Sequence, residues 1–66
     1  MKLIVNGSER QVADGARGLQ LLEQLGINPG TCVAEVNGKV FTAAQFVERT
    51  LSDGDIIELV TIVGGG

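Results

Sequence analysis

The chain has 66 residues, of which 44% are hydrophobic, and its five basic and eight acidic side chains give a formal net charge of −3. A chain of this length forms one domain with a single core, and its basic residues stand singly rather than in a stripe, so we expect no nucleic-acid partner. With no histidine and one cysteine, the chain alone lacks the ligands of a structural zinc site, and it cannot form an intrachain disulfide.

The chain opens with a predicted β-hairpin. Met1 to Val5 is rich in strand-forming residues, and Asn6-Gly7 is the strongest two-residue signal for a hairpin turn. We expect a short return strand through Arg10 to Ala13, which ends at Asp14-Gly15.

A helix follows the hairpin. Its leucines, which recur at helical spacing, are Leu19, Leu21, Leu22 and Leu25. Gly26 stands where a left-handed residue ends a helix, and Ile27 is placed to contact Leu22, as in a Schellman motif. Gly18 is the expected N-cap, and because it has no side-chain acceptor we expect a weakly held first turn.

A second hairpin is predicted after the loop at Asn28-Pro29-Gly30. Cys32 to Val36 alternates as a strand does, and Asn37-Gly38 turns the chain into Lys39-Val40-Phe41. Thr42 is then placed to cap a short helix that carries Ala43, Ala44, Phe46 and Val47.

The last predicted element is an apolar strand over Ile56 to Val63, reached through the turn Ser52-Asp53-Gly54-Asp55. The order of elements predicts an α+β domain, with one main helix packed on one face of a mixed sheet of about five strands. Because the last strand is almost wholly apolar, we place it centrally, beside the first. The predicted domain covers residues 1–63.

Residues 64–66 form a predicted flexible tail of glycines, which follows Val63 directly. Without Cβ atoms the tail is thin, and fully extended it spans roughly 10 Å. It is therefore suited to enter a narrow channel and present its carboxylate to another protein. A frayed terminus is the alternative interpretation of the tail by itself.

Three features together resemble the ThiS family of sulfur carriers, within the ThiS/MoaD superfamily. They are Asn37-Gly38 after a strand, Leu51-Ser52-Asp53-Gly54-Asp55 before the last strand, and the Val63-Gly64-Gly65-Gly66 ending. The resemblance covers the whole chain and implies the ubiquitin-like β-grasp fold. It also implies a role in thiamin biosynthesis, at the step that forms the thiazole ring.

In this family the C-terminal glycine is adenylated and then converted to a thiocarboxylate. By resemblance, Gly66 carries the sulfur, while Gly65 and Gly64 give access to it. The implied partners are a ThiF-type adenylyltransferase, which consumes ATP, a ThiG-type thiazole synthase, and a sulfur donor such as a cysteine desulfurase system. The carrier itself is expected to bind no cofactor and no metal and to supply no catalytic group, so it is a co-substrate rather than an enzyme.

Other functions remain open at this point. The same tail chemistry serves carriers for molybdopterin or another sulfur-accepting pathway, and a ubiquitin-like protein modifier or interaction module also fits the sequence. Cys32 invites a persulfide hypothesis, but it alternates with apolar residues in its strand and has no cation beside it in the sequence. We therefore expect Cys32 to have a packing role.

The sheet is predicted to offer a docking face, because alternate residues of a strand share one face. The face toward the helix is expected to carry Leu3, Val5, Ile57, Leu59 and Val63. The opposite face is expected to carry Ile4, Glu58, Val60 and Ile62. Exposed apolar residues grouped beside a functional tail suggest a site for a protein partner.

A cytoplasmic location is also predicted. A lone thiol suits a reducing compartment. Strand-like sequence from Lys2 leaves no room for a signal peptide, and no apolar run approaches the roughly 18 residues of a membrane span.

Overall fold

The structure is a computed structural model that describes residues 1–61. Its elements, in chain order, are β1 (Lys2–Val5), β2 (Ser8–Gln11), α1 (Gly18–Leu25), the 3₁₀ turn η1 (Pro29–Thr31), β3 (Cys32–Val36), β4 (Lys39–Phe41), α2 (Ala43–Glu48) and β5 (Ile56–Thr61). The predicted end of the last strand and the predicted boundary between domain and tail lie outside the described residues.

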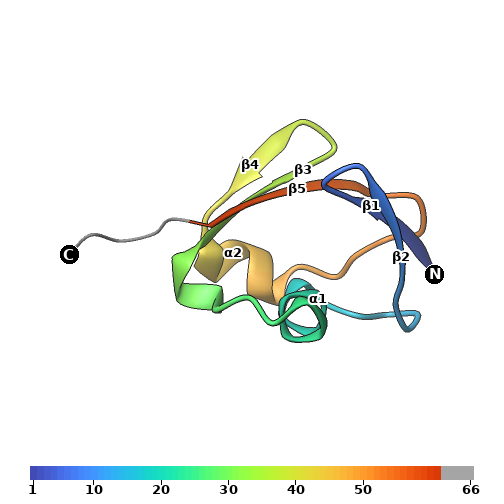
Figure 1. The fold of residues 1–66 in the computed structure, drawn as a ribbon, viewed down its shortest axis with the longest axis horizontal. Helices are drawn as coiled ribbons and strands as arrows, with labels where there is room; N and C mark the ends of the chain where they lie inside the picture. The colour runs from blue at the N-terminus through green and yellow to red at the C-terminus, as the bar shows by residue number, and fades with distance from the viewer. Residues whose placement is uncertain (62–66) are drawn as a thin grey trace.

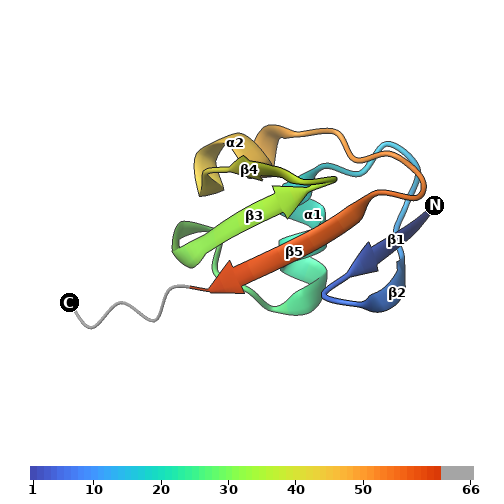
Figure 2. The same ribbon diagram turned by 90° about the horizontal axis from the view of Figure 1, so that it is seen from above.

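The five strands form one mixed sheet in the order β2-β1-β5-β3-β4. β1 and β5 are parallel, and the other neighbours are antiparallel. Figure 1 shows both helices on one side of this sheet, and Figure 2 shows the strands from the opposite side. The predicted central place of the last strand, beside the first, is therefore confirmed.

Both predicted hairpin turns are confirmed, and their asparagines also bind the central strand. Asn6 and Asn37 have positive φ angles of 50° and 51°, and the glycines after them also have positive φ, as type I′ turns require. The N–H of Leu59 donates to Asn6 Oδ1 (2.8 Å), and the N–H of Ile56 donates to Asn37 Oδ1 (2.9 Å). Each turn is thus joined to β5.

The Ser52–Asp55 turn connects three parts of the sheet. The N–H of Lys2 donates to Asp53 Oδ1 (2.7 Å), and the N–H of Gly54 donates to the carbonyl of Lys2 (2.7 Å). Buried Asp55 accepts hydrogen bonds from the N–H of Ser52 (2.8 Å) and from Asn37 Nδ2 (2.9 Å). Asn37 and the Ser52–Asp55 turn, which belong to the features behind the family resemblance, therefore fix how β1, β3 and β5 meet.

The end of α1 is as predicted, but its start is not. Gly26 is left-handed, with φ 71°, and the N–H of Ile27 donates to the carbonyl of Leu22 (2.9 Å), which confirms the Schellman motif. The N-cap is Arg17 rather than Gly18, and the N–H of Arg17 donates to Gln20 Oε1 (2.7 Å). The reason lies outside the helix, because the N–H of Gly18 donates to the carbonyl of Arg49 (2.9 Å) and so anchors the first turn.

Gly18 is needed because α1 and α2 approach each other closely there. A Cβ atom at this position would lie 2.0 Å from the carbonyl oxygen of Phe46, a backbone atom that cannot move aside by a simple rotation. Absence of a side chain, rather than freedom of the backbone, therefore explains this glycine.

Three further details refine the predicted elements. β2 begins at Ser8 and ends at Gln11, earlier than predicted, because the two-residue turn places Ser8 directly opposite Val5. Pro29–Thr31 forms a 3₁₀ turn capped by Asn28, rather than an irregular loop. The capping role of Thr42 is confirmed, since its side chain accepts the N–H of Gln45 (3.2 Å).

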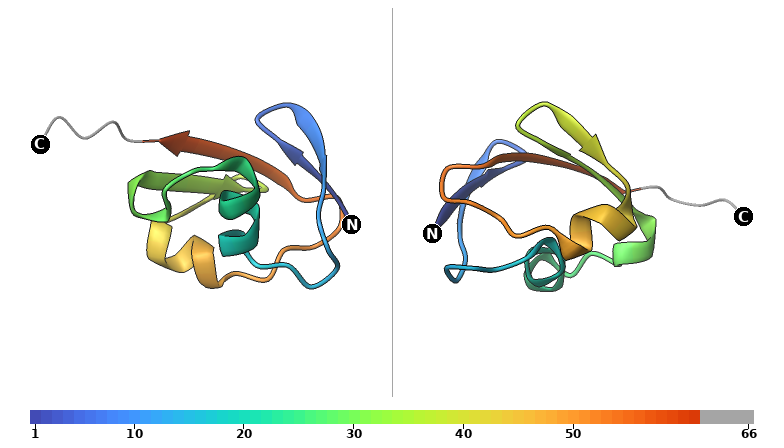
Figure 3. Two further views of the ribbon diagram at one scale, coloured as in Figure 1. Left: turned by 60° about the horizontal axis from the view of Figure 1, so that its bottom comes forward. Right: turned by 180° about the vertical axis from the view of Figure 1, so that it is seen from behind.

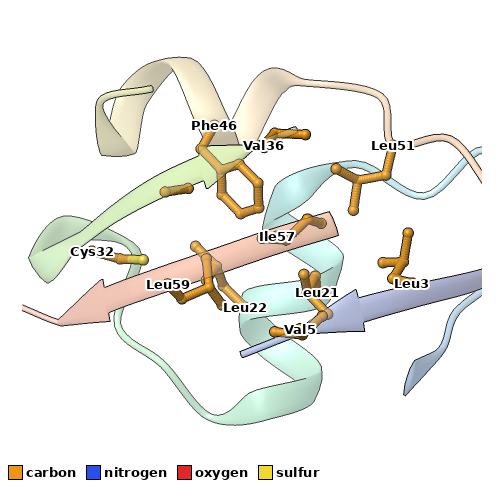
Figure 4. Close-up of a cluster of buried hydrophobic side chains, with 11 residues drawn as sticks. Leu3, Val5, Leu21, Leu22, Cys32, Val36, Phe46, Leu51, Ile57 and Leu59 are labelled. Atoms are coloured by element: carbon orange, nitrogen blue, oxygen red, sulfur yellow. The ribbon is translucent and has the colours of Figure 1, made fainter. Parts of the chain in front are cut away.

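The core lies between the sheet and the two helices. Figure 4 shows its side chains converging from both layers, and Figure 3 shows α1 and α2 lying across the sheet. The buried cluster contains Leu3, Val5, Leu21, Leu22, Cys32, Ala34, Val36, Phe46, Leu51, Ile57 and Leu59. Alternation along β1 and β5 therefore places four of the predicted residues on the helix side, while Val63 lies outside the described residues. The four are Leu3, Val5, Ile57 and Leu59.

Candidate functional site

The described part of the chain ends at Thr61, in the central strand. Thr61 pairs with Cys32, the residue that follows η1, so β5 delivers the chain to the end of the sheet beside η1. Four of the predicted site residues lie outside the described part of the chain, namely Ile62, Gly64, Gly65 and Gly66. β5 pairs with β1 at Ile56 and Ile57, and with β3 from Ile57 to Thr61, so its last residues are held by β3.

The sheet has an outer face, which we define as the side turned away from α1 and α2. Figure 2 looks onto this face, where the strands lie in front of α1. Of the predicted docking residues, Glu58 and Val60 are exposed there, and 61% of Val60 is accessible to solvent. Ile4 is half-buried on the same face. The predicted orientation of these three residues is confirmed, while their docking role stays a prediction.

Sequence reasoning left several residues of the outer face unnamed. Ile56 and Val40 are exposed to 57% and 70%, and Glu35 is the direct cross-strand partner of Glu58. Alternation along the last strand could have placed Ile56 on this face, since it stands two residues before Glu58. Glu35 could be placed in the same way, since it alternates with Cys32, which was expected to pack in the core. Val40 could not, because only the register of β4 with β3 places it on this face.

Cys32 is buried on the helix side of β3, in contact with the core cluster, and only 3% of it is exposed. Burial raises the pKa of its thiol above the ordinary value, because an apolar environment disfavours the thiolate. A protonated, buried thiol is a poor nucleophile, which supports the packing role over the persulfide hypothesis.

Cys32→Ser is expected to leave acceptance of sulfur by the protein intact while lowering its melting temperature modestly. The hydroxyl is more polar than the thiol and fits a buried apolar site less well. Mass spectrometry of the loaded protein and a thermal melt measure the two effects separately. A variant that melts normally but no longer accepts sulfur would instead support a persulfide on Cys32.

Residues 1–61 lack two kinds of feature. Within this range, no group of three or more His, Cys, Asp or Glu side chains is placed to hold a metal ion. Likewise, no helix in this part of the chain is both long and apolar enough to cross a membrane.

Comparison with known proteins gives a consistent result. The model of the ThiS family matches residues 3–66. The sulfur carrier protein ThiS of Escherichia coli is 29% identical over 66 residues and is covered completely, as is this chain. ThiS of Thermus thermophilus is 29% identical over 62 residues, which are 94% of this chain and 95% of that protein.

Two other matches extend the comparison. The crystal structure of ThiS from Geobacter metallireducens aligns with a TM-score of 0.77 and 33% identity over all of both chains. A thiazole synthase of Paramagnetospirillum magneticum is 32% identical over this whole chain, which spans only 20% of the length of that enzyme. The mixed sheet with its helices is thus the ubiquitin-like β-grasp arrangement expected from the sequence.

Proposed function

Because the chain belongs to the ThiS family, we propose that it is a sulfur carrier of thiamin biosynthesis, which delivers sulfur for the thiazole ring as a thiocarboxylate on Gly66. The observation that carries this proposal is the match over the full length to a protein named as sulfur carrier ThiS, with both chains covered completely. The carrier is a co-substrate of its partners and contributes no catalytic group.

The proposed chemistry starts from the α-carboxylate of Gly66. This group has a pKa of about 3.3–3.7 and is ionised at neutral pH, which makes it a poor electrophile. A ThiF-type adenylyltransferase joins it to AMP from ATP and releases pyrophosphate. The persulfide of a sulfur donor, such as a cysteine desulfurase system, then attacks the acyl carbon and expels AMP, which gives an acyl disulfide. A thiol cleaves the S–S bond of this intermediate and forms a disulfide with the donor sulfur, so the acyl carbon keeps sulfur in place of one oxygen.

The fold of residues 1–61 supports this role by giving the proposed carrier a folded body of its own. Within residues 1–61, the core cluster runs from Leu3 to Leu59 and fills the space between the sheet and the two helices. The described part of the chain ends at Thr61, which β3 holds in the sheet through its pairing with Cys32. Gly64 and Gly65 then add length without side chains, which suits entry into a narrow active site.

Thiazole synthase is the proposed acceptor of the sulfur. One protein named thiazole synthase contains a segment that is 32% identical to this entire chain. Joining a carrier to the enzyme that uses it raises the effective concentration of the carrier at the active site. This relative therefore supports a ThiG-type synthase as the partner in the present case.

Intact mass spectrometry tests the proposed function. The full chain is incubated with ATP, the ThiF-type adenylyltransferase of the same organism and a sulfur source. We expect a mass gain equal to the exchange of one oxygen for one sulfur, localised to the C-terminal peptide. A chain whose mass stays unchanged with an active adenylyltransferase would contradict the proposal. Complementation of a thiamin auxotroph, but not of a molybdenum-cofactor auxotroph, would separate thiazole synthesis from the molybdopterin alternative.

We further propose that the outer face, through Ile4, Glu58, Val60 and Ile62, docks the adenylyltransferase while the tail enters the active site. Val60→Asp is expected to slow adenylation about tenfold at limiting enzyme, because an unpaired charge is costly to bury in an apolar contact. Val60 is mostly exposed, so the variant should fold normally. Steady-state kinetics should show the loss chiefly in KM, and saturating adenylyltransferase should largely restore the rate.

Gln24→Glu is the matched control for Val60→Asp. It adds the same charge at an exposed position of α1, on the helix side. We expect the adenylation rate of this control to stay close to that of the unaltered protein. Equal rates for all three proteins would show that the tail alone is recognised.

A further inference from the structure

The outer face places two carboxylates directly opposite each other. Glu35 of β3 is the register partner of Glu58 of β5, and both side chains are exposed. Cβ atoms at directly opposed positions lie about 4.5–5.5 Å apart, and like charges placed so destabilise a sheet. This pair therefore opposes folding, so its presence needs an explanation other than stability.

No cation within residues 1–61 is paired with either carboxylate. The side-chain ion pairs of this range join Lys2 to Glu9 (3.8 Å) and Arg17 to Glu48 (3.5 Å). The guanidinium of Arg49 lies over the Phe41 ring, 4.7 Å from its centroid. The two remaining basic side chains belong to Arg10 and Lys39. In the strand register they stand opposite Leu3 and Val36, which face the core, so both lie on the helix side of the sheet rather than on the outer face.

Exposed apolar side chains surround this acidic pair. Val40 is the register partner of Glu35 on its other side, while Ile56 and Val60 stand two residues before and after Glu58 on the same face. These three are exposed to 70%, 57% and 61%. A protein that covers the apolar side chains must also cover the two carboxylates between them. Burying carboxylates is costly unless a positive charge pairs with them.

We propose that Glu35 and Glu58 together receive one arginine, which stands at the centre of an otherwise apolar docking surface on the adenylyltransferase. This inference rests on the proposed function and adds to it the chemistry by which the partner recognises the carrier. A guanidinium presents several N–H donors in one plane and is more weakly hydrated than an ammonium group, so it suits two neighbouring carboxylates in an apolar contact. The repulsion between the two carboxylates in the free carrier is relieved when the guanidinium arrives.

The test compares two double variants of the full chain with the same change in net charge. Glu35→Gln/Glu58→Gln removes the acidic pair, and Glu23→Gln/Glu48→Gln removes two exposed carboxylates on the helices. The probe is the ThiF-type adenylyltransferase of the same organism, and its rate of association with the carrier is measured over a range of salt concentrations. Thermal melts are recorded for all variants.

We expect the acidic-pair variant to associate about tenfold more slowly at low salt and to respond less to added salt, because charge complementarity acts mainly on encounter and register. Its melting temperature should equal or exceed that of the unaltered protein, since like charges no longer face each other. The helix variant should associate within about twofold of the unaltered protein.

Two different failures are distinguishable. If the unaltered chain is adenylated normally and both double variants associate with the same rate and salt dependence, the arginine contact is wrong while the carrier function stands. A melting temperature clearly below that of the unaltered protein in the acidic-pair variant would also overturn the inference, because it would give the pair a structural role. If the unaltered chain is not adenylated at all, the proposed function itself fails.

Discussion

Removal of Gly66 is expected to abolish formation of the thiocarboxylate while leaving the folded domain unchanged. The reacting carboxylate would then belong to Gly65, about 3.3–3.6 Å short of its normal reach along an extended chain. Positioning errors of about 1 Å already cost large factors in rate, so this displacement should bring sulfur loading below detection. Intact mass measures the loading, and a thermal melt measures the fold.

Addition of one glycine after Gly66 is the matched control for this truncation. It retains every residue of the chain and displaces the carboxylate by the same distance in the opposite direction. We expect the same loss of loading and the same melting temperature. Normal loading of either variant would show that the position of the C-terminal carboxylate does not matter, which contradicts the proposed mechanism.

Leu22→Ala is expected to have the largest effect on stability, a loss of about 2–5 kcal/mol. Leu22 is completely buried between α1 and the sheet, so truncation removes apolar contacts and leaves a cavity (Figure 4). A domain of this size has a total stability of only roughly 3–10 kcal/mol, so the variant would lose a large part of it. We expect the melting temperature to fall by about 10 °C or more.

Leu19→Ala is the control for Leu22→Ala, since it makes the same change in the same helix. Leu19 is exposed to 37%, so less apolar contact is lost, and alanine has the higher helix propensity. Its cost should therefore stay below about 1 kcal/mol. Equal destabilisation by the two substitutions would contradict the orientation of α1.

The local elements of this protein could be predicted from the sequence because their signals act over a few residues. Asn-Gly accepts the positive φ angles of a type I′ turn, Thr42 caps the helix that begins at the next residue, and Gly26 ends α1 in a left-handed conformation. Each of these depends on backbone geometry and hydrogen bonds between near neighbours. Alternation along β5 similarly predicted which residues face the core.

The family resemblance could also be inferred from the sequence alone. The glycines at residues 64–66, together with Asn37-Gly38 and the Leu51–Asp55 segment, were enough for the family resemblance that the comparisons then confirmed. No contact of the tail with the folded body was needed for that inference, since the proposed chemistry takes place in other proteins.

Tertiary structure decided the features that depend on residues far apart in the chain. The start of α1 is held by the carbonyl of Arg49, and Gly18 is required by the approach of Phe46, although local propensity would favour alanine there. The opposition of Glu35 and Glu58 depends on the register between β3 and β5. These features follow from packing and strand pairing across the whole fold. The preferences of single residues cannot predict them, because the neighbours of a side chain are set only once the sheet and helices are assembled.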